Sequence, residues 1–265
     1  MINKIQILAV LATLICSCNA PEQQKEVTAA EPIPIEKMQL ADSTAFYSIA
    51  AAYPIDPGDR DSIMATIINN LVEEKKEDWK MGGVAYLDEQ KMTREIPGKP
   101  MPRYELNIAY EATESANYQS RSYLFRIFEY TGGASGNTRV MSFNYNTDGR
   151  LTLEDVLQTQ DGKDIAISRL VAEQALKDHP DFAKEMLLDG LGLAFLKEDG
   201  VSLDKEKCKC DGFLFASNLQ HFVLLDEGIR FYFNKYQIAP GVFGTPAVLI
   251  SWKQLEPYLN EHFKQ

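Results

Sequence analysis

A nearly unbroken apolar run lies near the N-terminus. Residues 5–15 (IQILAVLATLI) follow the positive charge of Lys4. Eleven residues are too few to cross a hydrocarbon core of about 30 Å, which needs about 20 residues. A charge followed by a short apolar run is typical of a signal peptide. A buried core helix is the alternative, but the polar, proline-containing residues that follow argue against it. We therefore predict that residues 1–17 are a signal peptide.

The end of this run resembles the lipobox of bacterial lipoprotein signals, because an aliphatic residue and two small residues precede Cys18 (ICSC, residues 15–18). Cys16 is the weaker candidate, since the bulky Ile15 would lie at the cut. Acyl chains on Cys18 would anchor the chain, with about 0.8 kcal/mol from each buried CH₂. A plain secretory signal is the alternative. The prediction is a lipoprotein secreted across the inner membrane and anchored in the cell envelope, on the periplasmic face or in the outer membrane.

The segment after the cleavage site lacks apolar periodicity. Residues 18–40 contain Pro32, Pro34 and several charges, and such segments do not offset the entropy of becoming ordered. They predict a flexible tether. An N-terminal module is expected at residues 41–120, with strands at 45–53 and 104–110. Between them, Asp59 or Asp61 would cap a helix that runs to about Trp79.

The larger part of the body is expected at residues 121–265. Apolar patterning predicts helices at 163–178, 182–193 and 253–263, and strands at 123–130, 140–146, 212–216, 221–225, 229–234 and 247–252. Residues 123–130 are apolar on both faces, which indicates a central strand. Strands and helices occur in groups, which favours an α+β fold with a mainly antiparallel sheet and packed helices. A small N-terminal module would precede a larger C-terminal one.

The net charge indicates which classes of partner are disfavoured. The formal net charge is −11, and loss of Lys4 with the signal peptide lowers it to −12. This disfavours nucleic acid and anionic lipid headgroups and permits a cationic partner.

Outside the signal, only Cys208 and Cys210 remain. In a strand their Cα atoms would lie about 6.5 Å apart, so they are predicted to be free thiols or a bridge in a loop.

Three stretches resemble one domain family: residues 123–137 (YLFRIFEYTGGASGN), residues 141–157 (MSFNYNTDGRLTLEDVL), and residues 222–259, which contain FVLLDEGIRFYFNKYQIAPGVFG and VLISWKQLEPYL. The chain is similar to the RsiV/PdaC-type family of lysozyme-sensing anti-sigma factor ectodomains and non-catalytic regions of peptidoglycan deacetylases. Ser135 stands where that family often has histidine. The resemblance implies a binding module whose partner is a lysozyme-like muramidase or peptidoglycan.

The residues themselves favour a protein that is not an enzyme. His179, His221 and His262 are not spaced as metal ligands on one element. The sequence around Ser135 departs from the G-x-S-x-G nucleophile elbow, and the loop lacks the Gly-Lys-Ser/Thr ending of a phosphate loop. We therefore predict no catalytic residue, no metal and no cofactor.

Two segments are candidates for binding. The first is a loop with Gly132, Gly133, Ser135 and Asn137, although its glycines are also explained by backbone geometry where the chain leaves a strand. The second holds Tyr232 and Tyr236, whose rings are available to stack on sugars or to fill an interface, although such aromatic residues are more often core. An enzyme acting on cell-wall glycan and a purely structural envelope lipoprotein are the alternative functions.

Overall fold

The computed structural model describes residues 36–92, 103–210, 212, 213 and 215–264, with side chains from 36 to 85 in the first range. Ile35–Gln265 is one compact unit. The predicted signal peptide, the lipidation site Cys18 and most of the predicted tether lie outside the described residues. The end of that tether was placed too late, because residues 36–40 belong to a strand that pairs along its whole length.

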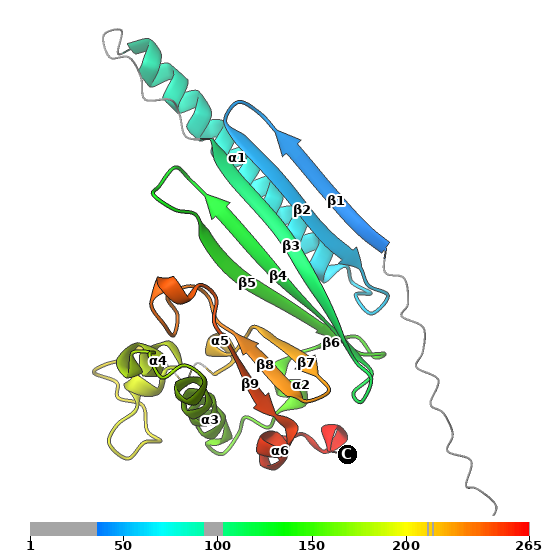
Figure 1. The fold of residues 1–265 in the computed structure, drawn as a ribbon, viewed down its shortest axis with the longest axis vertical. Coiled ribbons are helices and arrows are strands. Elements are labelled where there is room, and N and C mark those ends of the chain that lie inside the picture. The colour runs from blue at the N-terminus through cyan, green and yellow to red at the C-terminus, as the bar shows by residue number, and fades with distance from the viewer. Residues whose placement is uncertain (1–35, 93–102, 211, 214, 265) are drawn as a thin grey trace, which may run out of the picture. The chain divides into compact units, whose positions relative to one another are not determined.

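Six strands form the first sheet in the order of the sequence (Figure 1). They are β1 (Glu36–Ser43), β2 (Tyr47–Ile55), β3 (Tyr104–Ser115), β4 (Ser120–Tyr130), β5 (Asn137–Tyr145) and β6 (Arg150–Leu151). Neighbouring strands are antiparallel except β2 and β3, which are parallel. Helix α1 (Ile63–Met92) connects these two, because parallel neighbours need a long crossover. The α+β class with a mainly antiparallel sheet is confirmed.

Helix α1 covers one face of the first sheet. The carboxylate of Asp59 accepts hydrogen bonds from the backbone N–H groups of Ile63 (2.9 Å) and Met64 (3.0 Å), so it caps the helix as predicted. Met64 begins the buried row of the helix, which continues through Ile68, Val72 and Trp79. This row packs on Tyr47, Ile49, Leu106, Ile108, Tyr123, Phe125, Ile127, Phe143 and Tyr145. The helix extends beyond Trp79, where the prediction ended it.

The second sheet has three antiparallel strands, β7 (Phe222–Leu225), β8 (Gly228–Tyr232) and β9 (Ala247–Ser251). Helix α3 (Lys163–Asp178) packs beside β9 (Figure 1) and has the bounds that the apolar pattern predicts. Its buried residues join those of the sheet in a core that includes Ile167, Val171, Ala175, Leu224, Ile229, Phe231, Val248 and Ile250. The remaining elements are α2 (Leu153–Val156), α4 (Lys184–Gly190), η1 (Leu193–Phe195), α5 (Phe215–Asn218), η2 (Gly241–Phe243), α6 (Trp252–Leu255), η3 (Glu256–Tyr258) and η4 (Glu261–Phe263).

The two sheets meet through β7, an edge strand that contacts β3, β4 and β5. The backbone N–H of Phe222 donates to Ser142 Oγ (2.9 Å), and that of Leu224 donates to Ser122 Oγ (2.9 Å). The Asn144 side-chain amide donates to the Phe222 carbonyl (3.0 Å). Buried backbone groups need partners, so the polar side chains of residues 122, 142 and 144 complete the hydrogen bonding of β7.

Removing these serine hydroxyls is expected to destabilise the fold. Ser122→Ala or Ser142→Ala leaves a buried N–H of β7 without its acceptor, which costs about 1–3 kcal/mol. Chemical denaturation followed by circular dichroism measures the loss. The matched control is Ser135→Ala, because Ser135 is exposed and its replacement should change the free energy of unfolding by less than about 0.5 kcal/mol. Equal stability of all three variants would contradict this role of β7.

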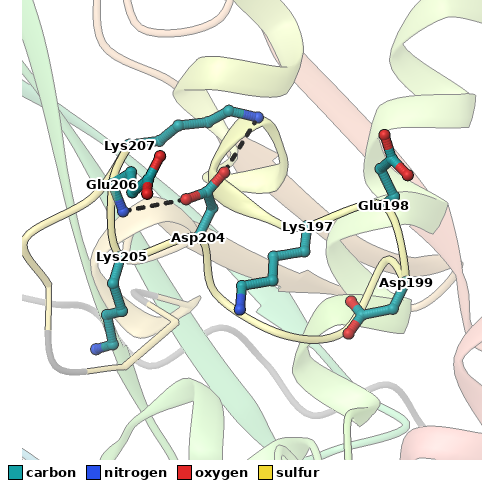
Figure 2. A pocket seen from close by; sticks show the side chains of 7 residues that line it. All are labelled: Lys197, Glu198, Asp199, Asp204, Lys205, Glu206 and Lys207. Atoms are coloured by element: carbon teal, nitrogen blue, oxygen red, sulfur yellow. Dashed lines mark hydrogen bonds and ion pairs between the residues drawn. The ribbon is translucent and has the colours of Figure 1, made fainter.

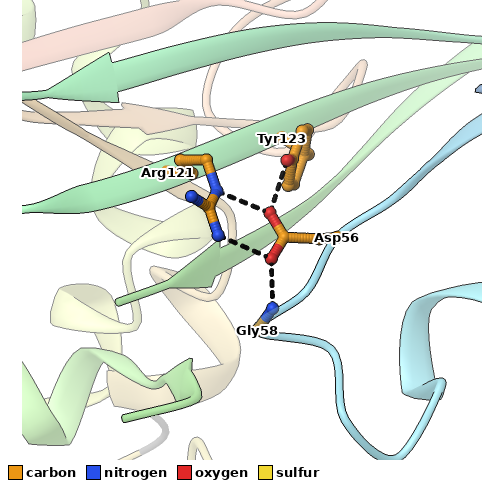
Figure 3. A network of polar contacts seen from close by, with 4 residues as sticks. All are labelled: Asp56, Gly58, Arg121 and Tyr123. Atoms are coloured by element: carbon orange, nitrogen blue, oxygen red, sulfur yellow. Dashed lines mark hydrogen bonds and ion pairs between the residues drawn. The ribbon is translucent and has the colours of Figure 1, made fainter. Parts of the chain in front are cut away.

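A buried carboxylate fastens the turn between β2 and α1 to β4 (Figure 3). Asp56 accepts two hydrogen bonds from the Arg121 guanidinium (2.7 and 2.9 Å), one from the Tyr123 hydroxyl (2.5 Å) and one from the Gly58 N–H (2.5 Å). Burial by itself would raise the pKa of the Asp56 carboxyl, but these hydrogen bonds outweigh it and hold the pKa below its ordinary value. Burial and the nearby Asp56 raise the pKa of Tyr123.

The structure does not divide at the predicted boundary between residues 120 and 121. Strands β3 and β4 pair from Glu105 opposite Tyr130 to Ser115 opposite Ser120, so both sides of the boundary belong to one sheet. The boundary was placed at a hairpin turn, because a short polar turn resembles a linker in sequence.

Two local predictions need correction. The described residues of the strand predicted at 212–216 do not form one, since α5 begins at Phe215 with its ring buried; short apolar runs do not distinguish the two structures. The final helix is broken into short turns at Pro257, which has no N–H for helical hydrogen bonding. Of the two alternatives predicted for Cys208 and Cys210, the bridge in a loop is confirmed, because the two residues form a disulfide with their Cα atoms 5.2 Å apart.

Candidate functional site

The glycine-rich segment singled out in the sequence is the loop between β4 and β5. Residues 131–135 are exposed. Gly132 has φ +89°, which favours glycine, and a Cβ at Gly136 would overlap the ring of Phe128. At Gly133, the nearest atom to an added Cβ is the Ser135 carbonyl oxygen at 3.9 Å, an ordinary contact. Backbone geometry therefore accounts for Gly132 and Gly136 but not for Gly133.

The two polar candidates of this loop differ in position. Ser135 lies at the exposed tip, whereas Asn137 is the first residue of β5 and pairs with Glu129. Asn137 is therefore a strand residue that faces solvent.

The two tyrosine candidates have opposite environments. Tyr232 is 9% exposed and packs in a small core with Leu124, Val140, Val223 and Leu225 between the sheets. Its ring serves the core and is not presented to a ligand, which differs from the prediction. Tyr236 is 61% exposed. Only this tyrosine of the pair is placed to contact a partner.

Tyr236 belongs to an exposed apolar patch on the connection between β8 and β9. Val242 and Phe243 on the same connection are 89% and 38% exposed. We call Tyr236, Val242 and Phe243 the β8–β9 patch. The Tyr236 ring lies against Gly241, where a Cβ would overlap it, and Lys235 Nζ lies 5.2 Å from the ring centroid. The signal in the sequence was the pair Val242-Phe243 between two turn glycines, where polar residues are more usual.

The patch is held from beneath by buried and hydrogen-bonded residues. Ile238 and Ala239 are buried in the core of the second sheet. Gln237 accepts from the Asn234 N–H (3.1 Å) and donates to the Asn218 carbonyl (2.9 Å). The Phe243 ring meets the edge of Phe182 with centroids 4.9 Å apart. The exposed side chains therefore project from an ordered base.

The connection that carries the patch contacts the β4–β5 hairpin. Asn234 Oδ1 accepts from the Val140 N–H (2.8 Å), and Arg126 donates to Thr245 Oγ1 (3.1 Å). Both contacts lie in the halves of β4 and β5 that lead into the predicted loop. Arg126 also pairs with Glu111 (3.1 Å). The connection that carries Tyr236 is therefore hydrogen-bonded to the two strands that lead into the predicted loop of residues 132–137.

Over the part of the chain that the structure describes, no group of three or more His, Cys, Asp or Glu side chains could hold a metal ion. The histidines lie apart: His179 ends α3, His221 precedes β7, and His262 lies in η4. Burial and the neighbouring Arg139 lower the pKa of His221 to about 4, so the imidazole is neutral near pH 7.

A large surface hollow lies elsewhere, between residues 197 and 207. It has a volume of about 720 Å³ and is lined by Lys197, Glu198, Asp199, Asp204, Lys205, Glu206 and Lys207 (Figure 2). Asp204 pairs with Lys207 (3.5 Å) and accepts from the Glu206 N–H (3.0 Å). The Ser202 hydroxyl and backbone hydrogen bonds lower the pKa of Asp199 to about 2. The hollow thus carries charges of both signs, and none of the described residues that line it is aromatic.

The fold and these sites define an α+β module with an exposed apolar patch. Residues 155–253 match the model of a family described as "Protein of unknown function (DUF3298)", which covers the elements from α2 to β9. This stretch of the chain is therefore similar to the DUF3298 family, and the β8–β9 patch lies inside it.

A relative from Bacillus subtilis and two solved structures are similar to this chain. The chain is 28% identical over 177 residues to the peptidoglycan-N-acetylmuramic acid deacetylase PdaC of Bacillus subtilis, which covers 66% of this chain and 33% of PdaC. The expected similarity to the RsiV/PdaC-type family is thereby confirmed, and the chain spans about a third of that protein's length.

The fold is shared with two solved DUF3298 family structures. The structure from Bacteroides fragilis has a TM-score of 0.56 and 20% identity, and covers 86% of this chain and 95% of its own. The structure from Pseudomonas aeruginosa has a TM-score of 0.52 and 15% identity, and covers 87% and 97%. Among the helices described here, none is long and apolar enough to span a membrane.

Proposed function

We propose that this protein is a non-catalytic binding module of the cell envelope, and that its β8–β9 patch recognises a lysozyme-like muramidase. The setting is supported by similarity to a protein whose name refers to peptidoglycan. The deacetylase activity in that name is not carried over, because the similarity covers 33% of PdaC. Anchoring through Cys18 belongs to the same proposal. Mass spectrometry of cell-derived protein would refute the anchoring if it found an unacylated N-terminus.

The conformation of Tyr236 is the observation that carries the proposal. Its φ is +69°, a region that costs a residue other than glycine about 1–2 kcal/mol. Strained residues persist where the surroundings hold them, and they cluster at functional sites. Here the strain displays a large ring that is 61% exposed. Tyrosine is among the residues that contribute most to protein interfaces.

Charge supports a cationic protein as the partner. The net charge of −11 attracts a basic protein over a distance and raises its association rate at low ionic strength. The patch then supplies short-range apolar contact. Association should therefore weaken as salt increases, mainly through the association rate.

The proposal is tested by calorimetry with a basic c-type lysozyme and the chain lacking residues 1–18. We expect binding at micromolar protein in low salt, and at least about a tenfold loss of affinity for Tyr236→Ala. Val242→Ser should weaken binding too. Its matched control is Val84→Ser, because Val84 is also exposed, at 56%, but lies on α1. No heat with the unmodified chain, or equal losses from both serine variants, would overturn the proposal.

Stability and binding should change in opposite directions when Tyr236 becomes glycine. Tyr236→Gly removes the backbone strain and is expected to raise the free energy of unfolding by up to about 1 kcal/mol, while lysozyme binding is lost with the ring. Urea denaturation and calorimetry on the same variant measure the two effects. A large loss of stability would show instead that the ring serves the fold.

A further inference from the structure

A second hollow, of about 410 Å³, lies where the β3–β4 turn meets the C-terminal segment. Three aromatic rings from distant parts of the chain converge on it: Tyr118 from the turn, Trp252 from α6 and Phe263 from η4. Its volume falls in the range of small-molecule sites, roughly 300–1,000 Å³. Neither the predicted loop nor the β8–β9 patch contributes to its lining.

The rings are held in place before any ligand arrives. The Tyr118 ring centroid lies 4.2 Å from that of Trp252 and 5.6 Å from that of Phe263, with which it stacks at 20°. The Trp252 Nε1–H donates to the Leu225 carbonyl (2.9 Å). Asp226 holds the turn that carries Tyr118 by accepting from the Ser115 hydroxyl (2.8 Å) and the Asn117 N–H (3.3 Å). A preordered site loses less entropy on binding.

The rim of the hollow carries charges of both signs. Lys253, Glu256 and Lys264 line it and are exposed, and Lys264 pairs with Glu261 (2.6 Å). Donors and acceptors therefore surround an aromatic wall, and Leu259 adds a buried apolar surface. A purely apolar peptide would leave the charged side chains of the rim without partners. A strongly ionic ligand would be repelled by the rim charges of its own sign.

We propose that this hollow binds a short stretch of N-acetylated amino-sugar glycan. A pyranose ring offers an apolar C–H face that packs on an aromatic ring, and its hydroxyl and acetamido groups both donate and accept hydrogen bonds. The acetyl methyl group suits the surface near Leu259 and Phe263. The glycan is the kind of polymer that the proposed envelope setting provides. The residues are nevertheless distinct from the β8–β9 patch, so the two binding proposals can fail separately.

The test is a nuclear magnetic resonance titration of the chain lacking residues 1–18 with a trisaccharide of N-acetylglucosamine. The protein has two tryptophans, and Trp79 is buried where α1 packs on the first sheet, so its indole N–H signal is an internal control. We expect saturable shifts of the Trp252 indole signal with a dissociation constant of about 1 mM or below, and a weaker response to cellotriose, which lacks acetamido groups. No saturable shift at about 10 mM sugar would overturn the proposal.

Variants separate this site from the patch. Tyr118→Ala should weaken sugar binding about tenfold, and the exposed pair Lys253→Ala and Glu256→Ala should weaken it about threefold without disturbing the fold. The double variant keeps the test decisive if Tyr118→Ala does not fold. Tyr236→Ala is the matched control and should bind sugar normally. Unchanged affinity in the folded double variant, or a loss with Tyr236→Ala, would refute this assignment.

Discussion

Replacing Asp56 by alanine is expected to lower the free energy of unfolding by about 3–5 kcal/mol, because it leaves the Arg121 guanidinium and the Tyr123 hydroxyl without their buried acceptor. Guanidinium denaturation measures the loss. The control is Asp61→Ala, since Asp61 lies in the same turn but is exposed, and the expected change is below about 0.5 kcal/mol.

A double-mutant cycle shows whether the pair acts as a unit. Arg121→Met alone leaves the Asp56 carboxylate buried without its cation, whereas Asp56→Ala with Arg121→Met removes both charges. The double variant should therefore lose at least about 1 kcal/mol less stability than the two single losses added together. Strict additivity would mean that Asp56 stabilises the turn without coupling to Arg121.

Stability should fall as the pH decreases from about 6.5 to about 4, because of His221. The folded protein holds the pKa of this imidazole at about 4, below its ordinary value of 6.5. In this window the unfolded chain therefore binds a proton that the folded protein does not, which favours unfolding as the pH falls. The contribution is complete above pH 6.5 and amounts to about 3 kcal/mol.

Denaturation midpoints measured at several pH values test this dependence. His221→Gln should flatten the curve between pH 4 and 6.5, and His262→Gln, at an exposed position, should leave the slope unchanged. Asp56 contributes in a different pH range. Because the folded protein lowers the pKa of its carboxyl, the stability that Asp56 contributes is lost as the pH falls below the ordinary carboxyl pKa of 3.8. A slope that persists in His221→Gln would assign the dependence to other groups.

Local patterning predicted the elements whose reasons are local. Helix α3 has an apolar period and Pro180 after its end, and β4 is apolar on both faces because α1 covers one and β7 the other. The capping box at Thr152 and Asp155, at the start of α2, likewise depends only on residues close together in the sequence. Whether a segment is a helix or a strand could therefore be predicted where residues close together in the sequence determine it.

Contacts between distant residues escaped the same patterning. Asp56 and Arg121 are 65 positions apart, and the sequence of the turn near Pro57 does not indicate that Asp56 has a partner on β4. The hollow near Tyr118 depends on residues separated by more than half of the chain. Of the binding candidates, Tyr236 is exposed and Tyr232 is core, a difference that depends on how β8 packs on β4.

The hydrogen bonds between β7 and the side chains of Ser122, Ser142 and Asn144 bear on which part of the chain can fold by itself. The stretch that matches the family model, residues 155–253, contains β7 but none of these three side chains. Produced by itself, it would carry an open, hydrophobic strand edge, the kind of edge that recruits other chains into aggregates. The boundaries of the sequence family and those of a piece that folds by itself are therefore expected to differ.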